Sequence, residues 1–337
     1  METNQAVVFK APKQAEIQDV PMPVPKAGEV IIRTRCTLIS TGTELTVFEG
    51  AFPKNSEWDK SVKFPHIPGY NNVGEVVSTG AGVDPGLVGK RFASYGSHSR
   101  FVAKPLTELF PVRPDLPDEE AVFFAIPLIV ANSIRKSRLA WGEAVIVYGL
   151  GLLGQFTVRF CRLCGARPVF AVDISERKIG FLPVDRQIVR INPKKQDVVQ
   201  VVREATKGRM ADVVFEVTGS PSLIPGEFAA LHEQGRFIVL SSPRGKTEFD
   251  FHDLCNHPSF TIIGTHNYSH PPTPSPENPW TMPRHVEFFF DLAADGELDV
   301  KQLISERRPF TDAPEVYASL LRDRSEAMGI LFQWPEA

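Results

Sequence analysis

The stretch AVIVYGLGLLG at residues 144–154 decides the fold. Its first five residues form an apolar run that predicts a buried strand, and the pattern G-x-G-x-x-G follows, directly before a helix-compatible run from Gln155. In such a turn Gly149 permits a tight bend, Gly151 lets a pyrophosphate approach the backbone, and Gly154 lets the helix pack closely on the strand. The unpaired N–H groups at the start of the helix can then bind phosphate, so the stretch predicts a dinucleotide-binding domain.

An acidic residue follows the next predicted strand. Asp173 ends the apolar run that begins at Val169, about 20 residues beyond Gly154, where a carboxylate can accept hydrogen bonds from both ribose hydroxyls. A carboxylate there repels a 2′-phosphate, so we expect NAD rather than NADP, a preference that the neighbouring Arg177 and Lys178 could relax. The residues expected to bind this cofactor are Gly149, Gly151, Leu152, Leu153, Gly154, Asp173, Ile174, Arg177, Val217, Thr218, Leu240, Ser241 and Ser242.

The rest of the chain shows two different sequence patterns. In the first third, short β-branched runs are broken by glycine and proline, which predicts a partly antiparallel β domain. Residues 118–136 can form a helix that Pro127 would kink or end. Beyond them strands alternate with helix-like segments, such as 223–232 before the strand 235–240, which predicts a parallel sheet covered on both faces. The segment 269–283 is a proline-dense irregular loop. The fold class is therefore α/β, a β-rich domain plus a doubly wound parallel sheet.

Composition excludes several classes of partner. The chain has 337 residues and a formal net charge of −3, so no electrostatic argument favours nucleic acid or a membrane surface. No apolar run reaches the ~18 residues that a membrane span needs, and the first residues lack the apolar core of a signal peptide. The four cysteines, Cys36, Cys161, Cys164 and Cys255, are too sparse for a disulfide framework. We expect a cytoplasmic protein that binds a small-molecule substrate.

Four further segments carry a family likeness. PKAGEV at 25–30, PGYNNVGEV at 68–76, GSHSRFV at 96–102 and DLAADGEL at 291–298 resemble segments of the medium-chain dehydrogenase/reductase superfamily. The resemblance covers essentially the whole chain. It implies a GroES-like catalytic domain made of residues 1–125 and 270–337, a Rossmann NAD-binding domain at 126–269, and assembly as a homodimer or homotetramer.

The chain departs from the zinc-binding members of that superfamily at their ligand positions. Aligned on Glu44 and Gly50, the three catalytic zinc ligands fall on Thr41, Tyr70 and Ile126. None of these residues is the cysteine, histidine or carboxylate that zinc prefers, and the four-cysteine lobe for structural zinc is also missing from the sequence. We therefore expect no metal.

Two other stretches contain donor residues. HDLCNH at 252–257 is interpreted as a solvated loop, away from the expected active site. Cys161 and Cys164 fall on the helix after the glycine-rich turn, where packing is the simpler interpretation than redox chemistry.

Without zinc, side chains must polarise a carbonyl or accept a hydroxyl proton. Thr43 corresponds to the position at which a hydroxyl relays the substrate proton in the superfamily, and Tyr70 stands where its metal-binding histidine would be. Glu44 could orient Thr43 or act as a base, and His98 and His66 are possible relays. The candidate catalytic residues are thus Thr43, Tyr70, Glu44 and His98. Non-catalytic interpretations stay open, since Tyr70 could fill the space vacated by the metal and Thr43 could bond backbone in a turn.

The leading hypothesis is a zinc-independent, NAD-dependent oxidoreductase that interconverts a secondary alcohol and a ketone. ISTGTE at 39–44 resembles the corresponding segment of dehydrogenases for sugar-like and tetrapyrrole side-chain alcohols, which favours a sugar, a cyclitol or another bulky polar alcohol. Polar residues of the proline-dense loop, His266, Asn267 and His270, could bind its hydroxyls. Two alternatives remain: an NAD(P)H-dependent reductase of enone or quinone carbon–carbon double bonds, and a non-catalytic NAD-binding protein.

Overall fold

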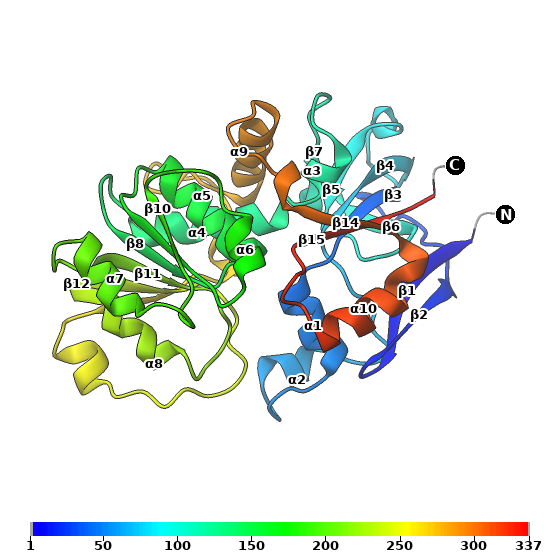
Figure 1. Ribbon diagram of the computed structural model, residues 1–337. Coiled ribbons are helices and arrows are strands. Elements are labelled where there is room, and N and C mark those ends of the chain that lie inside the picture. The colour runs from blue at the N-terminus through cyan, green and yellow to red at the C-terminus, as the bar shows by residue number, and fades with distance from the viewer. Residues whose placement is uncertain (1–2, 336–337) are drawn as a thin grey trace. The chain divides into compact units, whose positions relative to one another are not determined.

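The computed structural model describes residues 3–335, and the chain forms two compact units (Figure 1). Unit 1 consists of Met1–Ala125 and Val286–Ala337, and unit 2 is the continuous segment Ile126–His285. The sequence predicts a catalytic domain of residues 1–125 and 270–337 and a cofactor domain of residues 126–269. In the structure, the contacts of residues 270–285 group them with unit 2 instead.

Unit 2 is built on a six-stranded sheet in the order β10-β9-β8-β11-β12-β13, with all neighbouring strands parallel. The strands are β8 (Val145–Tyr148), β9 (Val169–Val172), β10 (Ile188–Ile191), β11 (Ala211–Glu216), β12 (Leu231–Val239) and β13 (Thr261–Gly264). The chain order reverses between β8 and β11. The crevice beyond the carboxyl ends of these two strands is therefore the place at which such sheets bind ligands.

Helices cover both faces of this sheet, with α5 and α6 on one side and α7 and α8 on the other (Figure 1). The helical elements of unit 2 are α4 (Ala125–Ser137), α5 (Leu152–Leu163), α6 (Glu176–Gly180), α7 (Val198–Ala205), α8 (Ile224–Glu227), η3 (Phe228–Ala230), η4 (His252–Asn256), η5 (Asn267–Ser269) and the start of α9 (Met282–Ala294). Ile146, Phe170 and Val214 are fully buried in one of the resulting cores. Strands covered on both faces have to be apolar throughout, which explains the continuous runs.

Unit 1 combines a hairpin with a larger, mostly antiparallel sheet in the order β14-β15-β3-β4-β5-β7, in which β6 also pairs with β3. Its strands are β1 (Asn4–Ala11), β2 (Gln14–Val20), β3 (Glu29–Leu38), β4 (Asn72–Thr79), β5 (Arg91–Ser94), β6 (Phe101–Pro105), β7 (Leu109–Pro111), β14 (Ile304–Pro309) and β15 (Gly329–Gln333). Its helical elements are α1 (Thr41–Glu49), α2 (Glu57–Ser61), η1 (Pro85–Leu87), η2 (Leu106–Glu108), α3 (Asp118–Ala121), η6 (Lys301–Leu303), η7 (Phe310–Asp312) and α10 (Ala313–Arg322).

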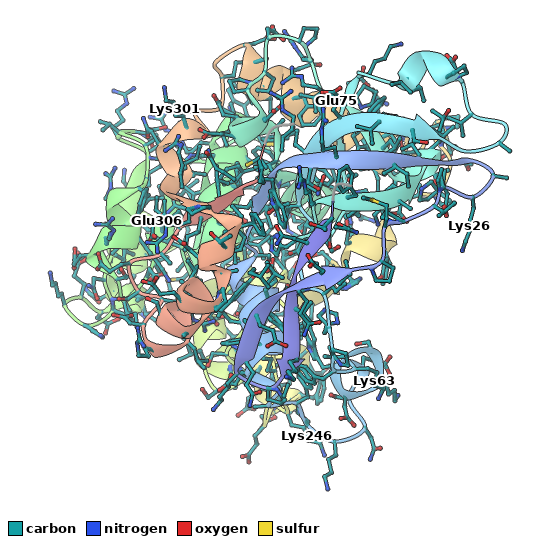
Figure 2. The ribbon with its side chains drawn as sticks, turned by 90° about the vertical axis from the view of Figure 1, so that its right-hand side faces the viewer. Lys26, Lys63, Glu75, Lys246, Lys301 and Glu306 are labelled. Atoms are coloured by element: carbon teal, nitrogen blue, oxygen red, sulfur yellow. The ribbon has the colours of Figure 1, made fainter. Side chains whose placement is uncertain are left out.

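The two ends of the chain meet inside unit 1. Strand β15 pairs antiparallel with β3, and α10 lies beside the hairpin strand β2 (Figure 1). Phe9 from β1, Phe48 from α1 and Tyr317 from α10 pack in one aromatic core. Figure 2 shows Lys26 at the outer end of the loop that enters β3, where its backbone N–H donates to the Glu29 carboxylate at 2.9 Å.

Several element boundaries differ from the sequence predictions. The helical segment expected over 118–136 is divided into α3, which ends at Ala121, and α4, which begins at Ala125, so that Pro127 lies in the first turn of α4, where no backbone donor is needed. The helix expected over 223–232 is shorter: α8 and η3 end at Ala230, and β12 starts at Leu231. Among the described residues, no helix is both long and apolar enough to cross a membrane.

Candidate functional site

The glycine-rich turn has the geometry that its pattern predicts. Gly149 directly follows β8 with φ +95°, a conformation that favours glycine, and Gly151 is the residue before the first turn of α5. A Cβ atom on Gly154 would lie 1.8 Å from the carbonyl oxygen of Gly149, so only glycine lets α5 pack this closely on the turn. A Cβ on Gly151 would meet no protein atom within 4 Å, which leaves open space beside the first N–H groups of α5.

Asp173 lies directly after β9 and braces this turn. Its Oδ2 accepts the backbone N–H of Leu150 at 2.8 Å, and its Oδ1 accepts that of Ser175 at 2.8 Å. Each carboxylate oxygen keeps a second lone pair, so both can still accept a hydroxyl hydrogen. Ile174 beside it is 58% exposed, and the Arg177 guanidinium lies 6.0 Å from the centroid of the Phe181 ring.

Glu216, which the sequence analysis did not single out, organises the other half of the crevice. It ends β11 and accepts hydrogen bonds from Thr218 N–H at 2.7 Å, Thr218 Oγ1 at 2.7 Å and Gly219 N–H at 2.9 Å, and from the Ser241 hydroxyl. The loops after β11 and β12 are thereby tied together. The hydroxyls of Thr218 and Ser241, both expected to bind the cofactor, already donate to Glu216 and can only accept from a ligand.

The remaining expected cofactor residues lie around the same strand ends. Leu152 and Leu153 start α5, and Val217 donates its N–H to the carbonyl of Tyr148 at 2.9 Å. Leu240 is buried at the end of β12, and Ser242 after it is exposed. The structure thus collects all the expected cofactor residues at the carboxyl edge of one sheet.

A second acid, Glu227, lies near Glu216. Burial, and then the charge of Glu216, raise the pKa of Glu227 to about 9. Both Glu227 carboxyl oxygens are buried without a hydrogen-bond partner in the part of the chain that the structure describes. Burial and then the charge of Glu227 also raise the pKa of Tyr148. Glu227 is therefore a neutral carboxylic acid at neutral pH, and an acid in an otherwise apolar helical segment was its sequence signal.

In unit 1, three hydroxyl groups gather at the start of α1. Ser40 is the residue before this helix, yet its side chain caps no backbone N–H. Instead, Tyr70 OH donates to Ser40 Oγ at 2.5 Å. Burial raises the pKa of Tyr70, and this rise is opposed by the hydrogen bonds that the Ser40 and Thr43 hydroxyls can donate to the ionised phenolate. The phenol is therefore protonated at neutral pH, and Tyr70 and Thr43 are brought together as expected, with Ser40 as a partner that the sequence analysis missed.

Glu44 and His98 form a second cluster that is entirely buried. Glu44 Oε1 accepts the Ser40 N–H at 2.7 Å, and Oε2 bonds His98 Nε2 at 2.9 Å and accepts the hydroxyl of Tyr317. Glu44 is 2% exposed and His98 is 0% exposed. These contacts join α1, α10 and the segment before β6. They also fix the backbone of Ser40, so Glu44 holds one member of the hydroxyl cluster in position. His66 stays apart, bonded through its backbone to Phe9, and burial lowers its pKa.

The positions that correspond to zinc ligands carry no metal donors. Thr41 and Tyr70 lie in unit 1, and Ile126 is a buried residue of α4. Over residues 3–335, no group of three or more His, Cys, Asp and Glu side chains is arranged to hold a metal ion.

The other donor stretches have ordinary surroundings. In the 252–257 segment, His252 Nδ1 pairs with Asp253 at 2.7 Å on an exposed turn. Cys161 is buried within α5 and Cys164 follows its end; burial raises the pKa of both thiols. Such thiols are poor nucleophiles and poor metal ligands.

Comparison with known proteins places these features in context. Residues 153–280 match the family model described as zinc-binding dehydrogenase. L-threonine 3-dehydrogenase from Pyrococcus horikoshii is 28% identical over 292 residues, 74% of this chain and 79% of that protein. D-guloside 3-dehydrogenase from Escherichia coli is 24% identical over 351 residues, 97% of this chain and 99% of that protein.

The fold is shared with solved structures. The crystal structure of 2R,3R-butanediol dehydrogenase from Bacillus subtilis has a TM-score of 0.81 and 20% identity, and the match covers 99% of this chain and 100% of that one. The expected fold class, a GroES-like β-rich domain plus a Rossmann doubly wound parallel sheet, is confirmed.

Proposed function

Because the resemblance to the medium-chain dehydrogenase/reductase superfamily is confirmed in sequence and fold, we propose that this chain is an NAD-dependent oxidoreductase that interconverts a secondary alcohol and a ketone without zinc. The observation that carries the proposal is the hydroxyl cluster of Tyr70, Ser40 and Thr43. By the resemblance, Tyr70 corresponds to a zinc-ligand position and Thr43 to the proton-relay position of the superfamily. Assembly as a homodimer or homotetramer belongs to the proposal through the resemblance alone, and a cytoplasmic location belongs to it through the composition.

The crevice of unit 2 fits a dinucleotide. The open space at Gly151 and the free N–H groups of α5 suit a pyrophosphate, and Asp173 has lone pairs for two ribose hydroxyls. The Asp173 carboxylate would repel a 2′-phosphate, which supports NAD over NADP. When bound, NAD supplies the hydride acceptor, and NADH the hydride donor. The exposed side chain of Ile174 would cover the adenine.

The hydroxyl cluster would handle the proton of the reaction. In ketone reduction, the carbonyl carbon gains a hydride and its oxygen gains a proton, which the protonated phenol of Tyr70 can donate. In alcohol oxidation, the carbon loses its hydride and the substrate hydroxyl loses its proton along the chain of Thr43, Tyr70 and Ser40, in which each hydroxyl accepts one proton and gives up its own, so that one proton is released to solvent. Glu44 holds Ser40 by its backbone N–H and so keeps the acceptor of Tyr70 in place.

The names of the relatives support a polar substrate. They are dehydrogenases of threonine, of a guloside and of butanediol, all small molecules with hydroxyl groups. The ISTGTE segment at 39–44 supports a sugar, a cyclitol or another bulky polar alcohol among these.

The test is turnover by protein treated with a chelator and dialysed. We expect NADH formation with at least one member of a panel of sugars, cyclitols and secondary alcohols, unchanged when zinc is added back. Turnover that returns only with zinc would overturn the metal-free mechanism. Oxidation of NADPH by enones or quinones, without any alcohol activity, would identify the double-bond reductase instead. Tight NAD binding with no turnover of any substrate would identify a non-catalytic binding protein.

A further inference from the structure

Unit 2 contains a cavity away from the glycine-rich turn. This cavity of about 450 Å³ is lined by Arg135, Lys136, Arg138, Arg236, Thr261 and Ile263. Arg236 is level with Val145, the first residue of β8, because both pair with Val213, and it also pairs with Thr261, the first residue of β13. The glycine-rich turn follows the last residue of β8. The cavity therefore lies at the amino end of the sheet, opposite the candidate cofactor crevice.

The cavity concentrates positive charge that the protein does not neutralise. Of its four cationic side chains, Arg236 forms an ion pair with Glu143. Within the described part of the chain, Arg135, Lys136 and Arg138 form no ion pair with any carboxylate. The net charge of the whole chain is −3, so the local excess of positive charge at the cavity is opposite in sign to the charge of the chain. Such a surface attracts anions.

Neutral groups hold Arg135 in position. Its Nε–H donates to His285 Nε2 at 3.0 Å, and its guanidinium lies 3.3 Å from the centroid of a Trp280 ring. His270 donates Nδ1–H to the carbonyl of Asn267 at 2.7 Å, so His270 Nε2 accepts from His285 Nδ1 at 3.1 Å. This leaves His285 Nε2 as the acceptor for Arg135.

His285 also keeps this role over the physiological pH range. Burial, and then the positive charges around it, lower the pKa of His285 to about 3. Arg135 is thus oriented without being neutralised, and its two terminal nitrogens have no hydrogen-bond partner among residues 3–335. A guanidinium fixed in this way presents a free fork of donors.

The turn after α4 is fixed as well. Arg236 Nη1 donates to the carbonyls of Ser137 at 2.7 Å and of Arg138 at 2.8 Å. Arg138 itself has φ +52°, a conformation held by these bonds. Lys136 and Arg138 are therefore presented by a rigid turn rather than by a mobile loop.

We propose that this cavity binds a small phosphate-bearing molecule at a site separate from the glycine-rich turn. Several guanidinium groups around one cavity match the planar oxygen pairs of a phosphate, which arginine binds through two parallel hydrogen bonds. Three unpaired cations exceed what a single carboxylate would neutralise, so a dianion or a polyanion fits better. The volume is within the range that small-molecule ligands occupy.

The test is titration of the full chain with inorganic pyrophosphate by calorimetry. The double variant Lys136→Gln/Arg138→Asn removes two cations, and asparagine tolerates the backbone conformation of Arg138. Because the double variant loses two charge-assisted hydrogen bonds to the anion, we expect the Kd to rise roughly 100-fold. Binding by the unaltered chain should also weaken when sodium chloride is added.

Lys207→Asn is the matched control, because Lys207 is an exposed lysine of the same unit with φ +56°. It should leave the Kd within about twofold, since it removes a charge without touching the cavity. Pyrophosphate binding that is equal in the double variant and the control would overturn the proposal, because the anion would then occupy another site. No binding by the unaltered chain at low salt would overturn it too. Circular dichroism of both variants establishes that they are folded.

Discussion

Removal of the Ser40 hydroxyl tests whether Tyr70 acts as the proton donor. Ser40 Oγ accepts from Tyr70 OH at 2.5 Å, and Ser40 is only 7% exposed, so bulk water does not readily replace it. One hydrogen bond contributes about 0.5–1.5 kcal/mol, and 1.4 kcal/mol is a factor of ten. Ser40→Ala is therefore expected to lower kcat roughly 3- to 10-fold. Tyr70→Phe removes the donor itself and is expected to lower kcat about 100-fold or more.

A double-mutant cycle separates this pathway from two independent effects. If Ser40 acts through Tyr70, the variant Ser40→Ala/Tyr70→Phe has the same kcat as Tyr70→Phe alone. Initial rates of NADH formation with saturating alcohol give the four values. Losses that simply multiply in the double variant would refute the reasoning. Ser56→Ala is the matched control, because Ser56 caps α2 by accepting the Asp59 N–H at 3.2 Å; it should cost about 1 kcal/mol of stability and leave kcat unchanged.

A spectroscopic signature distinguishes this positioning role from a loss of packing. The Ser40 hydroxyl can turn to donate to the ionised phenolate, and so lowers the pKa of Tyr70 against the larger effect of burial. Ser40→Ala should therefore move the pKa of Tyr70 further upward, which a titration of tyrosinate absorbance measures after subtraction of the Tyr70→Phe curve. An unchanged Tyr70 titration in Ser40→Ala would show that the two hydroxyls are not coupled in solution.

Three further outcomes are expected. Gly151→Ala should leave thermal stability unchanged, because its Cβ meets open space, but should weaken NAD binding roughly tenfold or more in a fluorescence titration. Gly154→Ala should lower both thermal stability and NAD affinity, since its Cβ would lie 1.8 Å from a carbonyl oxygen. Equal thermal stability of the two variants would contradict this. Asp173→Ser should lower the ratio of kcat/KM for NAD over NADP by about tenfold or more, and an unaltered ratio would remove Asp173 from cofactor selection. Glu227 has a folded pKa of about 9, above its ordinary 4.5, so it favours folding at low pH, and this contribution is lost as pH rises toward 9. In urea unfolding, the free energy of unfolding of Glu227→Gln minus that of the unaltered chain should increase by roughly 2–3 kcal/mol between pH 6 and pH 8. The same pH dependence for both proteins would contradict a neutral Glu227.

The fold was predictable because its main signals are local. The three glycines and the apolar run before them specify a strand, a tight turn and a helix in one short stretch, and the structure places β8 and α5 there. The parallel arrangement of the remaining strands follows from their alternation with helices. Helix boundaries were less predictable where a residue such as proline can either start a helix or interrupt one. Pro127 is compatible with a helix only in its first turn, and the sequence does not show where that turn begins.

Residues of the candidate site were predictable only where they belong to a recognisable sequence motif, such as the glycine-rich turn. Glu216 was missed because its role is to accept hydrogen bonds from Thr218, Gly219 and Ser241, and Ser241 is brought to it by the sheet, not by sequence spacing. Ser40 was missed for the opposite reason. A serine before a helix is expected to cap it, and only the position of Tyr70 shows that the hydroxyl is used elsewhere.

The two buried acids, Glu44 and Glu227, show why burial alone does not identify a catalytic carboxyl group. Both are almost fully buried. Glu44 accepts hydrogen bonds from Ser40, His98 and Tyr317, so its oxygens are engaged and it holds other groups in place. Glu227 has no partner among the described residues and lies near the charge of Glu216, so protonation is its means of avoiding an unpaired buried charge. Glu44 is thus used to position Ser40, His98 and Tyr317, and Glu227 is neutral, so neither is assigned as the base. The proton of the proposed reaction is therefore left to the hydroxyl groups of Tyr70, Ser40 and Thr43.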